Sequence, residues 1–442
     1  MAFNSLSRRG LLKSAGFAAA AAALPKWFLE ETLDAAEPAE PKSANDKPNI
    51  ALVGCGGRGR SDANEAKHYG NVIAVCDVDD RHAEATARAD HPGAKVYHDF
   101  RKLMERDDIH VIITGTPDHW HTLVNLHALR TGKDVYTEKP MTLTIDEGKQ
   151  IVDTVKKTGR VLQVGSQQRS DPSFRLACEL VRNGRLGKLQ EVQVVLPAGH
   201  RGGPFPPEQV PQGFDWDFWQ GQAPEAPYCQ QRTHTTFRFW YDYSGGTMTD
   251  WGAHHNDIAR WGIGLDGPVE IDGKQLVEPI PGGYTAAPEY VVEYTYANGV
   301  KHFCRSTTGD QWTGGAIKND PGVLHNGVTF KGADGWIFVT RGKIEASKPE
   351  LLNDPLPANA ERLYASNNHM GNFFECVRSR KEPVAPAEVG HRSVTVCHLG
   401  VLSMRLGRKL NWDPKKQEFV GDADANKWLS REMRKPWSYA AV

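Results

Sequence analysis

Two short motifs carry side chains suited to moving a proton and holding a negative charge. In Glu138-Lys139-Pro140, the proline disfavours a helical backbone at Lys139 and keeps it extended. Asp250 and His254 are four residues apart, so one helix would place them on one face, where the carboxylate orients the imidazole and makes it a better base. An ammonium and an imidazole together can deprotonate a hydroxyl group and stabilise the alkoxide that forms. Either motif alone also fits a purely structural contact.

A glycine-rich turn near the start of the chain predicts a phosphate-binding loop. Residues 50–53 form a short apolar run typical of a buried strand, and Gly54, Gly56 and Gly59 follow as a complete G-x-G-x-x-G. A helix is predicted over residues 62–69. Backbone N–H groups at the start of such a helix bind a pyrophosphate, and glycines leave room for it. The alternative is a glycine-rich loop beside an ordinary strand.

The next predicted strand, over residues 71–77, ends in an acid. Asp77 follows the glycine turn by about 20 residues, where the carboxylate that binds the ribose of a dinucleotide belongs. A carboxylate accepts a hydrogen bond from a 2′-hydroxyl group and repels a 2′-phosphate, so NAD is the predicted cofactor. Arg58 and Arg81 can weaken that preference, which leaves NADP possible.

The elements that must position these motifs fall into two groups. Strands and helices alternate from Asn49 to residue 165, which predicts a doubly wound parallel sheet with all strand carboxyl ends on one edge. The glycine loop, the loop 115–121 and the segment after Thr137 therefore share one rim. Later strands follow one another without crossover helices, which predicts a mostly antiparallel sheet with one open face.

The predicted fold class is α/β, with an N-terminal Rossmann doubly wound parallel sheet and a C-terminal α/β domain with an open-faced, mostly antiparallel sheet. The predicted divisions are a signal segment, a linker, a nucleotide-binding domain, a substrate and oligomerisation domain, and a tail: residues 1–36, 37–47, 48–165, 166–410 and 411–442. An open sheet face favours a homo-oligomer.

The N-terminal residues predict a targeting signal rather than a folded element. Arg8 and Arg9 precede an alanine-rich apolar segment, residues 15–24, which resembles a twin-arginine export signal. This route carries folded proteins, which suits a protein that binds its nucleotide before export, and it predicts a periplasmic location. Cleavage is compatible with residues 21–23 or with the region near Ala35.

Composition excludes several classes of partner. The chain has 442 residues and a formal net charge of −1, so nothing indicates nucleic acid or an anionic membrane surface. No apolar run of membrane-spanning length follows the N-terminal segment, which predicts no span in the mature chain. The seven cysteines are scattered and form no disulfide framework.

The ordered set of glycine turn, Asp77, Glu138-Lys139-Pro140 and Asp250-x-x-x-His254 resembles the Gfo/Idh/MocA oxidoreductases over roughly residues 49–414. The resemblance implies an NAD(P)-dependent enzyme that transfers a hydride between the nicotinamide and a hydroxyl-bearing carbon of a sugar, cyclitol or glycoside. The loops 115–121 and 232–243 look like an exported branch acting on sugars. Some relatives in it resemble NAD-dependent glycosidases, which oxidise, eliminate and reduce again.

The resemblance and the shared rim give three sets of predicted site residues. The catalytic residues are Lys139, Asp250 and His254. The cofactor-binding residues are Gly54, Gly56, Gly57, Arg58, Gly59, Asp77, Thr116, Pro117, His121, Glu138 and Lys139. The substrate-binding residues are Lys139, Arg169, His234, Tyr241, Asp250, His254 and His255.

Several histidines raise the question of a metal. The candidates are His119, His121, His234, His254 and His255. Imidazoles in a sugar pocket more often form hydrogen bonds, and hydride transfer to a nicotinamide needs no metal, so no metal is predicted. The aromatic residues of the loop 214–243 fit either a sugar-stacking surface or a core under the loop. The competing class of function is a nucleotide-bound carbohydrate-binding protein without catalysis.

Overall fold

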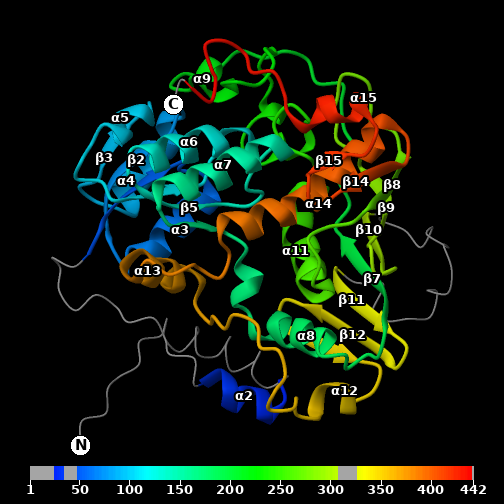
Figure 1. The fold of residues 1–442 in the computed structure, drawn as a ribbon. Helices are drawn as coiled ribbons and strands as arrows, with labels where there is room; N and C mark the ends of the chain where they lie inside the picture. The colour runs from blue at the N-terminus through cyan, green and yellow to red at the C-terminus, as the bar shows by residue number, and fades with distance from the viewer. Residues whose placement is uncertain (1–23, 34–46, 307–325, 441–442) are drawn as a thin grey trace, which may run out of the picture.

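The computed structural model describes residues 24–33, 47–306 and 326–440, which form two units, each built on one sheet (Figure 1). The signal and linker predictions fall largely on residues outside these ranges. The first sheet has six strands in the order β3-β2-β1-β4-β5-β6, all paired in parallel. Its strands are β1 (Asn49–Val53), β2 (Asn71–Cys76), β3 (Lys95–Tyr97), β4 (Val111–Thr114), β5 (Asp134–Thr137) and β6 (Leu162–Val164).

Helices connect these strands and cover both faces of the sheet, as the sequence predicts. Those helices are α3 (Gly57–Ala66), α4 (Asp80–Ala89), α5 (Arg101–Met104), α6 (Asp118–Arg130) and α7 (Ile145–Thr158). Strands β4 and β5 are buried along their whole length because helices pack on both sides. Helix α7 begins with the predicted capping box, in which Thr144 and Glu147 bond each other's backbone N–H groups.

The second sheet has nine strands in the order β13-β12-β11-β7-β10-β9-β8-β14-β15. Its pairs are antiparallel except β7 with β10, so the sheet is mixed but mostly antiparallel. Its strands are β7 (Leu189–Leu196), β8 (Glu270–Val277), β9 (Glu289–Thr295), β10 (Lys301–Ser306), β11 (Gly327–Gly332), β12 (Gly335–Thr340), β13 (Lys343–Ala346), β14 (Leu410–Asp413) and β15 (Glu418–Phe419). The predicted fold class is confirmed.

Helices pack on one face of this sheet, where α8, α11 and α14 contact its strands. The helices of this unit are α8 (Pro172–Arg182), α9 (Trp216–Gln220), α10 (Thr247–Asp250), α11 (Gly252–Ile263), α12 (Glu350–Asn353), α13 (His369–Ser379), α14 (Ala387–Leu406) and α15 (Ala423–Asn426). In β9, buried Tyr290, Val292 and Tyr294 alternate with half-buried residues, which is the pattern of a sheet with one covered face.

Three segments depart from the predicted divisions of the chain. Helix α13 returns to the first unit, where Phe373 and Phe374 join the core of Ile50 and Leu52. The expected C-terminal tail instead adds β14 and β15 to the second sheet, and Trp437 packs against Trp120 of α6. Because α13 comes after residue 165 and still packs on the first unit, no single boundary in the sequence separates the two units.

Part of the predicted signal segment is folded. Helix α2 (Lys26–Leu33) lies at the foot of the second unit in Figure 1. Phe28 of this helix is fully buried, with the guanidinium of Arg175 4.4 Å from its ring centroid, and Trp27 Nε1 donates a hydrogen bond to Leu352 O at 3.1 Å. Leu24 is also part of that core.

The long segment between β7 and α10 reaches across to the first unit. Asp80 N donates to Gly213 O at 2.8 Å and Asp215 N donates to Val78 O at 3.0 Å, just beyond the end of β2. Its aromatic side chains pack together as a buried cluster, which favours a core under the loop. Its aromatic members from this segment are Phe214, Trp219, Tyr228, Phe237, Phe239, Trp240 and Tyr243, and Tyr284 joins them from the connection between β8 and β9.

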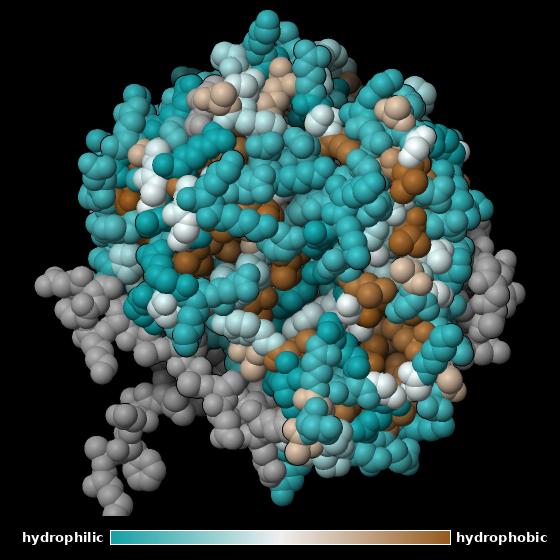
Figure 2. All heavy atoms as spheres, in the orientation of Figure 1, coloured by the Kyte–Doolittle hydropathy of each residue, from teal (hydrophilic) through white to brown (hydrophobic). Residues whose placement is uncertain are grey.

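The surface in Figure 2 is largely hydrophilic, and apolar side chains appear in separate patches, one of them at lower right over the second sheet. Among the described residues, no helix has the length and apolar character needed to cross a membrane.

Candidate active site

A cavity of about 690 Å³ lies where the parallel strands end, between the two units. The segments after β1, β2, β4 and β5 line it with Gly54, Asp77, Thr116 and Lys139 respectively. His254 and other residues of the second unit form the opposite wall. This edge is where open α/β sheets bind their ligands, and the rim predicted from the sequence is the rim of this cavity.

The glycine turn presents its backbone to the cavity. Helix α3 begins at Gly57, earlier than the helix predicted from the sequence, with Gly56 as an N-cap that no side chain caps. A Cβ atom at Gly56 or Gly57 would meet no atom within 4 Å, so open space lies in front of both residues. Gly54 has a φ of 90°, in the left-handed region that favours glycine. An uncapped helix start facing open space fits a dinucleotide pyrophosphate.

Asp77 lies just after the end of β2, beside the glycine turn. Its Oδ2 accepts a hydrogen bond from Cys55 N at 2.7 Å, and its Oδ1 accepts one from Asp79 N at 2.9 Å. These bonds fix the carboxylate at the cavity wall beside the glycine turn. The residues present therefore fit the cofactor predicted from the sequence.

Arg58 and Glu138 lie side by side along the same wall. Arg58 Nε donates to Glu138 Oε1 at 3.2 Å, and its Nη2 lies 2.5 Å from Oδ1 of the buried Asp62. Burial, then the nearby Glu138 carboxylate, raises the pKa of Asp62 well above its usual range. Arg58 thus connects the first turn of α3 to the residue before Lys139.

Lys139 and Asp250 form the centre of a second group of side chains in the cavity. Lys139 Nζ donates to Asp250 Oδ1 at 2.6 Å and to the Asp250 backbone oxygen at 3.0 Å. Arg238 Nε donates to the same Oδ1 at 3.1 Å. Burial alone would raise the pKa of Asp250, but the charges of Lys139 and Arg238 outweigh it and lower that pKa to about 2. Asp250 is therefore a carboxylate shared by two cations.

The helix expected to carry Asp250 and His254 together is interrupted. Helix α10 ends at Asp250 and α11 begins at Gly252. His254 N bonds Trp251 O at 3.0 Å, so the Asp250 carbonyl that a continuous helix would pair with His254 is left for Lys139. The sequence-based expectation that Asp250 orients His254 is not met, because Asp250 faces Lys139 and Arg238.

His254 lines the cavity from the start of α11. The residue is buried, and its Nδ1 has no hydrogen-bond partner among the described residues. Burial, then the positive charge of Lys139, lowers the pKa of His254 well below its usual range. The imidazole is therefore neutral at physiological pH, and a neutral imidazole can accept a proton.

Some predicted site residues lie outside the lining of the cavity. These residues are Gly59, His121, Arg169, Tyr241 and His255. A Cβ atom at Gly59 would collide with the carbonyl oxygen of Gly54, so this glycine lets α3 pack on β1 instead of facing the cofactor. His121 has one ring nitrogen 2.7 Å from Pro140 O and the other 2.9 Å from Thr116 O, which ties together two loops of the rim.

The remaining three have structural partners. Arg169 forms a buried bidentate pair with Asp257, at 2.7 and 2.8 Å. Tyr241 Oη accepts a hydrogen bond from Ala287 N at 3.1 Å. His255 Nε2 lies 2.6 Å from Asn326 Oδ1, and burial lowers the pKa of His255 to about 4.

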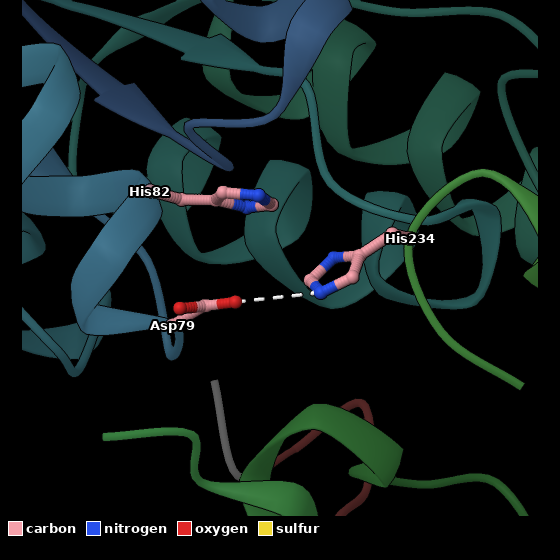
Figure 3. A group of neighbouring side chains, drawn as sticks. All are labelled: Asp79, His82 and His234. Atoms are coloured by element: carbon pink, nitrogen blue, oxygen red, sulfur yellow. Dashed lines mark ion pairs between the residues drawn. The ribbon is translucent and has the colours of Figure 1, made fainter. Parts of the chain in front are cut away.

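His234 does line the cavity, but beside the segment that follows β2 in the first unit. Its Nε2 lies 3.3 Å from Asp79 Oδ2, and its ring centroid is 4.6 Å from that of His82 in α4 (Figure 3). The ligand atoms of Asp79, His82 and His234 all lie within 4.8 Å of one another, the only such three-residue group of potential metal ligands among the described residues. The other histidines considered for a metal are not in this group.

Sequence reasoning missed several residues that line this cavity, of which Arg238 and His82 make the contacts described above. Arg238 pairs with Asp250, yet it lies in a 3-10 helix of four residues, Thr236–Phe239, which is too short to show a periodic pattern in the sequence. His82 follows Asp77 by five residues, and a histidine in the first turn after a ribose-binding acid is the one local signal that pointed to it.

Comparisons with known proteins agree with this fold. Residues 48–166 match the family model described as "Oxidoreductase family, NAD-binding Rossmann fold", and residues 203–439 match "Oxidoreductase family, C-terminal alpha/beta domain". A "Glycosyl hydrolase family 109 protein" of Saccharopolyspora erythraea is 33% identical over 207 residues, which cover 42% of this chain and 44% of that protein. An "Inositol 2-dehydrogenase/D-chiro-inositol 3-dehydrogenase" of Lacticaseibacillus casei is 34% identical over 142 residues, 31% and 41% of the two chains. The matches thus span less than half the length of these relatives.

Solved structures share the fold at low identity. The WlbA dehydrogenase of Bordetella pertussis, crystallised with NADH and UDP-GlcNAcA, superposes with a TM-score of 0.61 at 18% identity over 83% of this chain and 99% of that one. Levoglucosan dehydrogenase in complex with NADH and levoglucosan gives 0.59 at 17% identity over 83% and 99%. Because the C-terminal family model alone matches more than half of the chain, and the Rossmann model matches the unit that carries the glycine turn, the chain belongs to the Gfo/Idh/MocA oxidoreductase family and contains its NAD-binding Rossmann domain.

Proposed function

We propose that the protein is an NAD-dependent dehydrogenase that acts on a hydroxyl-bearing carbon of a sugar, cyclitol or glycoside. The observation that carries the proposal is the placement of Lys139, Asp250 and His254 in the same cavity as the uncapped glycine turn. Gly56, Gly57 and Asp77 would hold the cofactor, and the bound nicotinamide supplies the hydride acceptor or donor. The substrate class is supported by relatives and by fold neighbours whose names include sugar and cyclitol dehydrogenases.

Two side chains have separate roles in the reaction: His254 accepts the proton, and Lys139 stabilises the negative charge. An ammonium has three N–H groups, and Asp250 occupies two of those of Lys139, so the third remains for a substrate oxygen. Neutral His254 accepts the proton of the substrate hydroxyl as the hydride leaves its carbon. Lys139 then stabilises the alkoxide electrostatically.

Asp250 and Arg238 act on Lys139. The two contacts from Asp250 hold the ammonium in one place, and a carboxylate with a pKa of about 2 stays charged throughout the working range of pH. Arg238 shares that carboxylate, so Asp250 does not fully neutralise Lys139. The Lys139 ammonium therefore retains positive charge that can stabilise the alkoxide.

The direct test is reduction of NAD by a panel of sugars, cyclitols and glycosides, with NADH followed by absorbance. At least one compound should give turnover that Lys139→Met abolishes while NAD binding persists. Binding of NAD and carbohydrate with no turnover for any compound would support the competing class, a nucleotide-bound carbohydrate-binding protein.

A second candidate is glycoside cleavage through transient oxidation. It is favoured by the relatives named glycosyl hydrolase family 109 and by an "Alpha-N-acetylgalactosaminidase" of Shewanella oneidensis, 28% identical over 208 residues. In this reaction the hydride returns to the sugar, so an aglycone is released without accumulation of NADH. Net dehydrogenation instead yields NADH in proportion to product, and that ratio separates the two reactions.

We also propose that the protein is exported by the twin-arginine route to the periplasm. Support comes from Arg8 and Arg9 ahead of the apolar segment. The burial of Leu24 and Phe28 in the core of the second unit favours cleavage before Leu24 over cleavage near Ala35, because the later site would remove helix α2. Lys substitutions at both arginines should leave the protein in the cytoplasm, and mass spectrometry of the exported form should find Leu24 at or near its N-terminus. Unchanged fractionation would contradict the route.

We also propose that the protein is a homo-oligomer, because helices α8, α11 and α14 contact one face of the second sheet and β9 leaves alternate residues half-buried on the other. Light scattering on the purified chain tests it, and a monomer at micromolar concentration would refute it.

A further inference from the structure

The part of the cavity beside Asp77 has two imidazoles that the proposed chemistry does not use. His82 belongs to the first unit and His234 to the second, and both line the cavity. Strands β2 and β5 are separated by β1 and β4, so this part lies about 14 Å from Lys139, at about 4.8 Å per strand. A dinucleotide with its nicotinamide near Lys139 would extend its adenosine toward these histidines.

The walls beside the two imidazoles suit an adenine ring. Val78, Phe100 and Phe218 line the same cavity, and they offer apolar and aromatic surface. Figure 3 shows His82 and His234 on facing elements, with Asp79 next to both. The second unit therefore reaches the adenosine half of the site as well as the reaction centre.

His234 is held in an unusual backbone conformation to reach this place. Its φ is 50°, in the left-handed region, where residues other than glycine are uncommon and cost free energy. The long segment that carries His234, between β7 and α10, is also bonded to the first unit, where Asp80 N donates a hydrogen bond to Gly213 O at 2.8 Å. The fold thus fixes an imidazole from the second unit against the ribose-binding segment of the first.

The hydrogen-bonding state of His234 follows from its partner. Asp79 is buried and also accepts from Arg81, with Nε at 3.1 Å and Nη2 at 3.0 Å, and although burial opposes it, Arg81 and His82 lower the pKa of Asp79, so it is a carboxylate. A carboxylate has no proton to donate, so the 3.3 Å contact between His234 Nε2 and Asp79 favours the tautomer of His234 that carries its proton on Nε2. In that tautomer Nδ1 is the acceptor nitrogen, and burial, which lowers the pKa of His234, favours the neutral ring.

We propose that His234, together with His82, clamps the adenosine ribose of NAD, so that His234 Nδ1 and the Asp77 carboxylate accept hydrogen bonds from the ribose hydroxyl groups. A ribose diol donates two such bonds. A 2′-phosphate without protons offers only acceptors to both groups, so the clamp reinforces the rejection of NADP. The inference rests on the NAD-binding domain and not on the proposed sugar oxidation, so each can fail without the other.

Ligands that contain one half of the cofactor separate the clamp from the reaction centre. Binding of ADP-ribose, nicotinamide mononucleotide, NADH and NADPH to the full chain is measured by titration calorimetry. His234→Ala should weaken ADP-ribose and NADH by the same factor, on the order of tenfold for one lost hydrogen bond. It should leave nicotinamide mononucleotide unchanged and reduce the preference for NADH over NADPH. His82→Ala should show the same pattern with smaller losses of affinity.

Two variants control for indirect effects. His200 comes from the same long segment and lines the same cavity, but it stacks on Phe239 at 4.2 Å between ring centroids, next to Arg238. His200→Ala should leave ADP-ribose binding unchanged. His234→Asn tolerates the left-handed backbone and has no imidazole, so it should weaken ADP-ribose as His234→Ala does.

Three outcomes would overturn the clamp. The first is unchanged ADP-ribose affinity in His234→Ala. The second is an equal loss of nicotinamide mononucleotide affinity, which would show that the segment only supports the fold. The third is tight binding of Zn²⁺ that excludes ADP-ribose and is lost in His234→Ala, which would assign Asp79, His82 and His234 to a metal centre instead.

Discussion

Lys139 contacts Asp250 twice, at the carboxylate Oδ1 and at the backbone carbonyl, 2.6 and 3.0 Å from Nζ. The second contact exists because the helix breaks after Asp250, which frees a carbonyl that a continuous helix would use. The break therefore converts Asp250 from a partner of His254 into the anchor of the ammonium group.

Asp250→Asn should reduce kcat without a comparable change in NAD affinity. The amide has the same shape but cannot balance the charges of Lys139 and Arg238, so the ammonium loses its fixed position. Removing one preorganised group of this kind typically costs about 10²–10³-fold. Lys139→Met should be at least as damaging. Steady-state kinetics with a cofactor titration measure both, and an Asp250→Asn enzyme with normal kcat would show that Asp250 has no anchoring role.

His254→Ala should lose about 10²–10⁴-fold in kcat, the usual contribution of a positioned base. His255→Ala is the matched control, because His255 bonds Asn326 and does not line the cavity. Its effect on kcat should be small. Loss of activity in His255→Ala alone would exchange the assignments of the two histidines.

The pH profile gives a second check on His254. A base must be unprotonated to act, and burial and Lys139 lower the pKa of His254 well below its usual range. The kcat/KM of the wild type should therefore stay level as the pH falls through about 6.5, the ordinary histidine pKa, and decline only in more acidic solution. An acid limb centred near 6.5 that disappears in His254→Ala would contradict the lowered pKa.

Two glycines of the same turn should respond in opposite ways to alanine. A methyl group at Gly57 enters open space in front of the helix, so Gly57→Ala should keep the melting temperature and weaken NAD binding. A methyl group at Gly59 collides with the Gly54 carbonyl, so Gly59→Ala should lower the stability by about 1–3 kcal/mol. Thermal unfolding and NAD titration of both variants test this, and a destabilised Gly57→Ala with intact NAD affinity would reverse the assignment.

How far the sequence could predict this protein depends on the range of the interaction. The glycine turn, Asp77 and Lys139 follow local patterns of strand, turn and helix, and the structure places all three on one cavity. The contact of Arg238 with Asp250 lies within a short stretch of sequence but follows no helical or strand period, and the contact of His234 with Asp79 joins segments far apart in the chain, so neither appears as a local pattern. His254 was identified from its spacing to Asp250, although the helix that justified the spacing is broken.

Arg169→Ala should act on stability rather than on substrate affinity. Arg169 and Asp257 are both buried, and Ser393 Oγ also bonds Asp257. Removing one member of a buried pair leaves an unpaired charge and costs about 3–5 kcal/mol. Chemical denaturation measures the loss, and the KM of the folded fraction should be unchanged. A raised KM with normal stability would restore Arg169 to the substrate-binding residues predicted from the sequence.

His302 should make the second unit sensitive to acid. The residue is fully buried between Tyr294 and Tyr296, neither ring nitrogen has a hydrogen-bond partner among the described residues, and burial lowers its pKa to about 3. The unfolded chain binds the proton with a pKa of about 6.5, so stability is complete above that pH and falls by about 1.4 kcal/mol per pH unit below it. From neutral pH to pH 5 the loss is about 2 kcal/mol.

His302→Phe and His302→Gln cannot take up the proton, so both should remove that loss in denaturant titrations at the two pH values. Only His302→Phe should also gain stability at neutral pH, because Gln keeps unpaired polar atoms in the core. An unchanged acid loss in both variants would mean that His302 is protonated or hydrated in the folded protein.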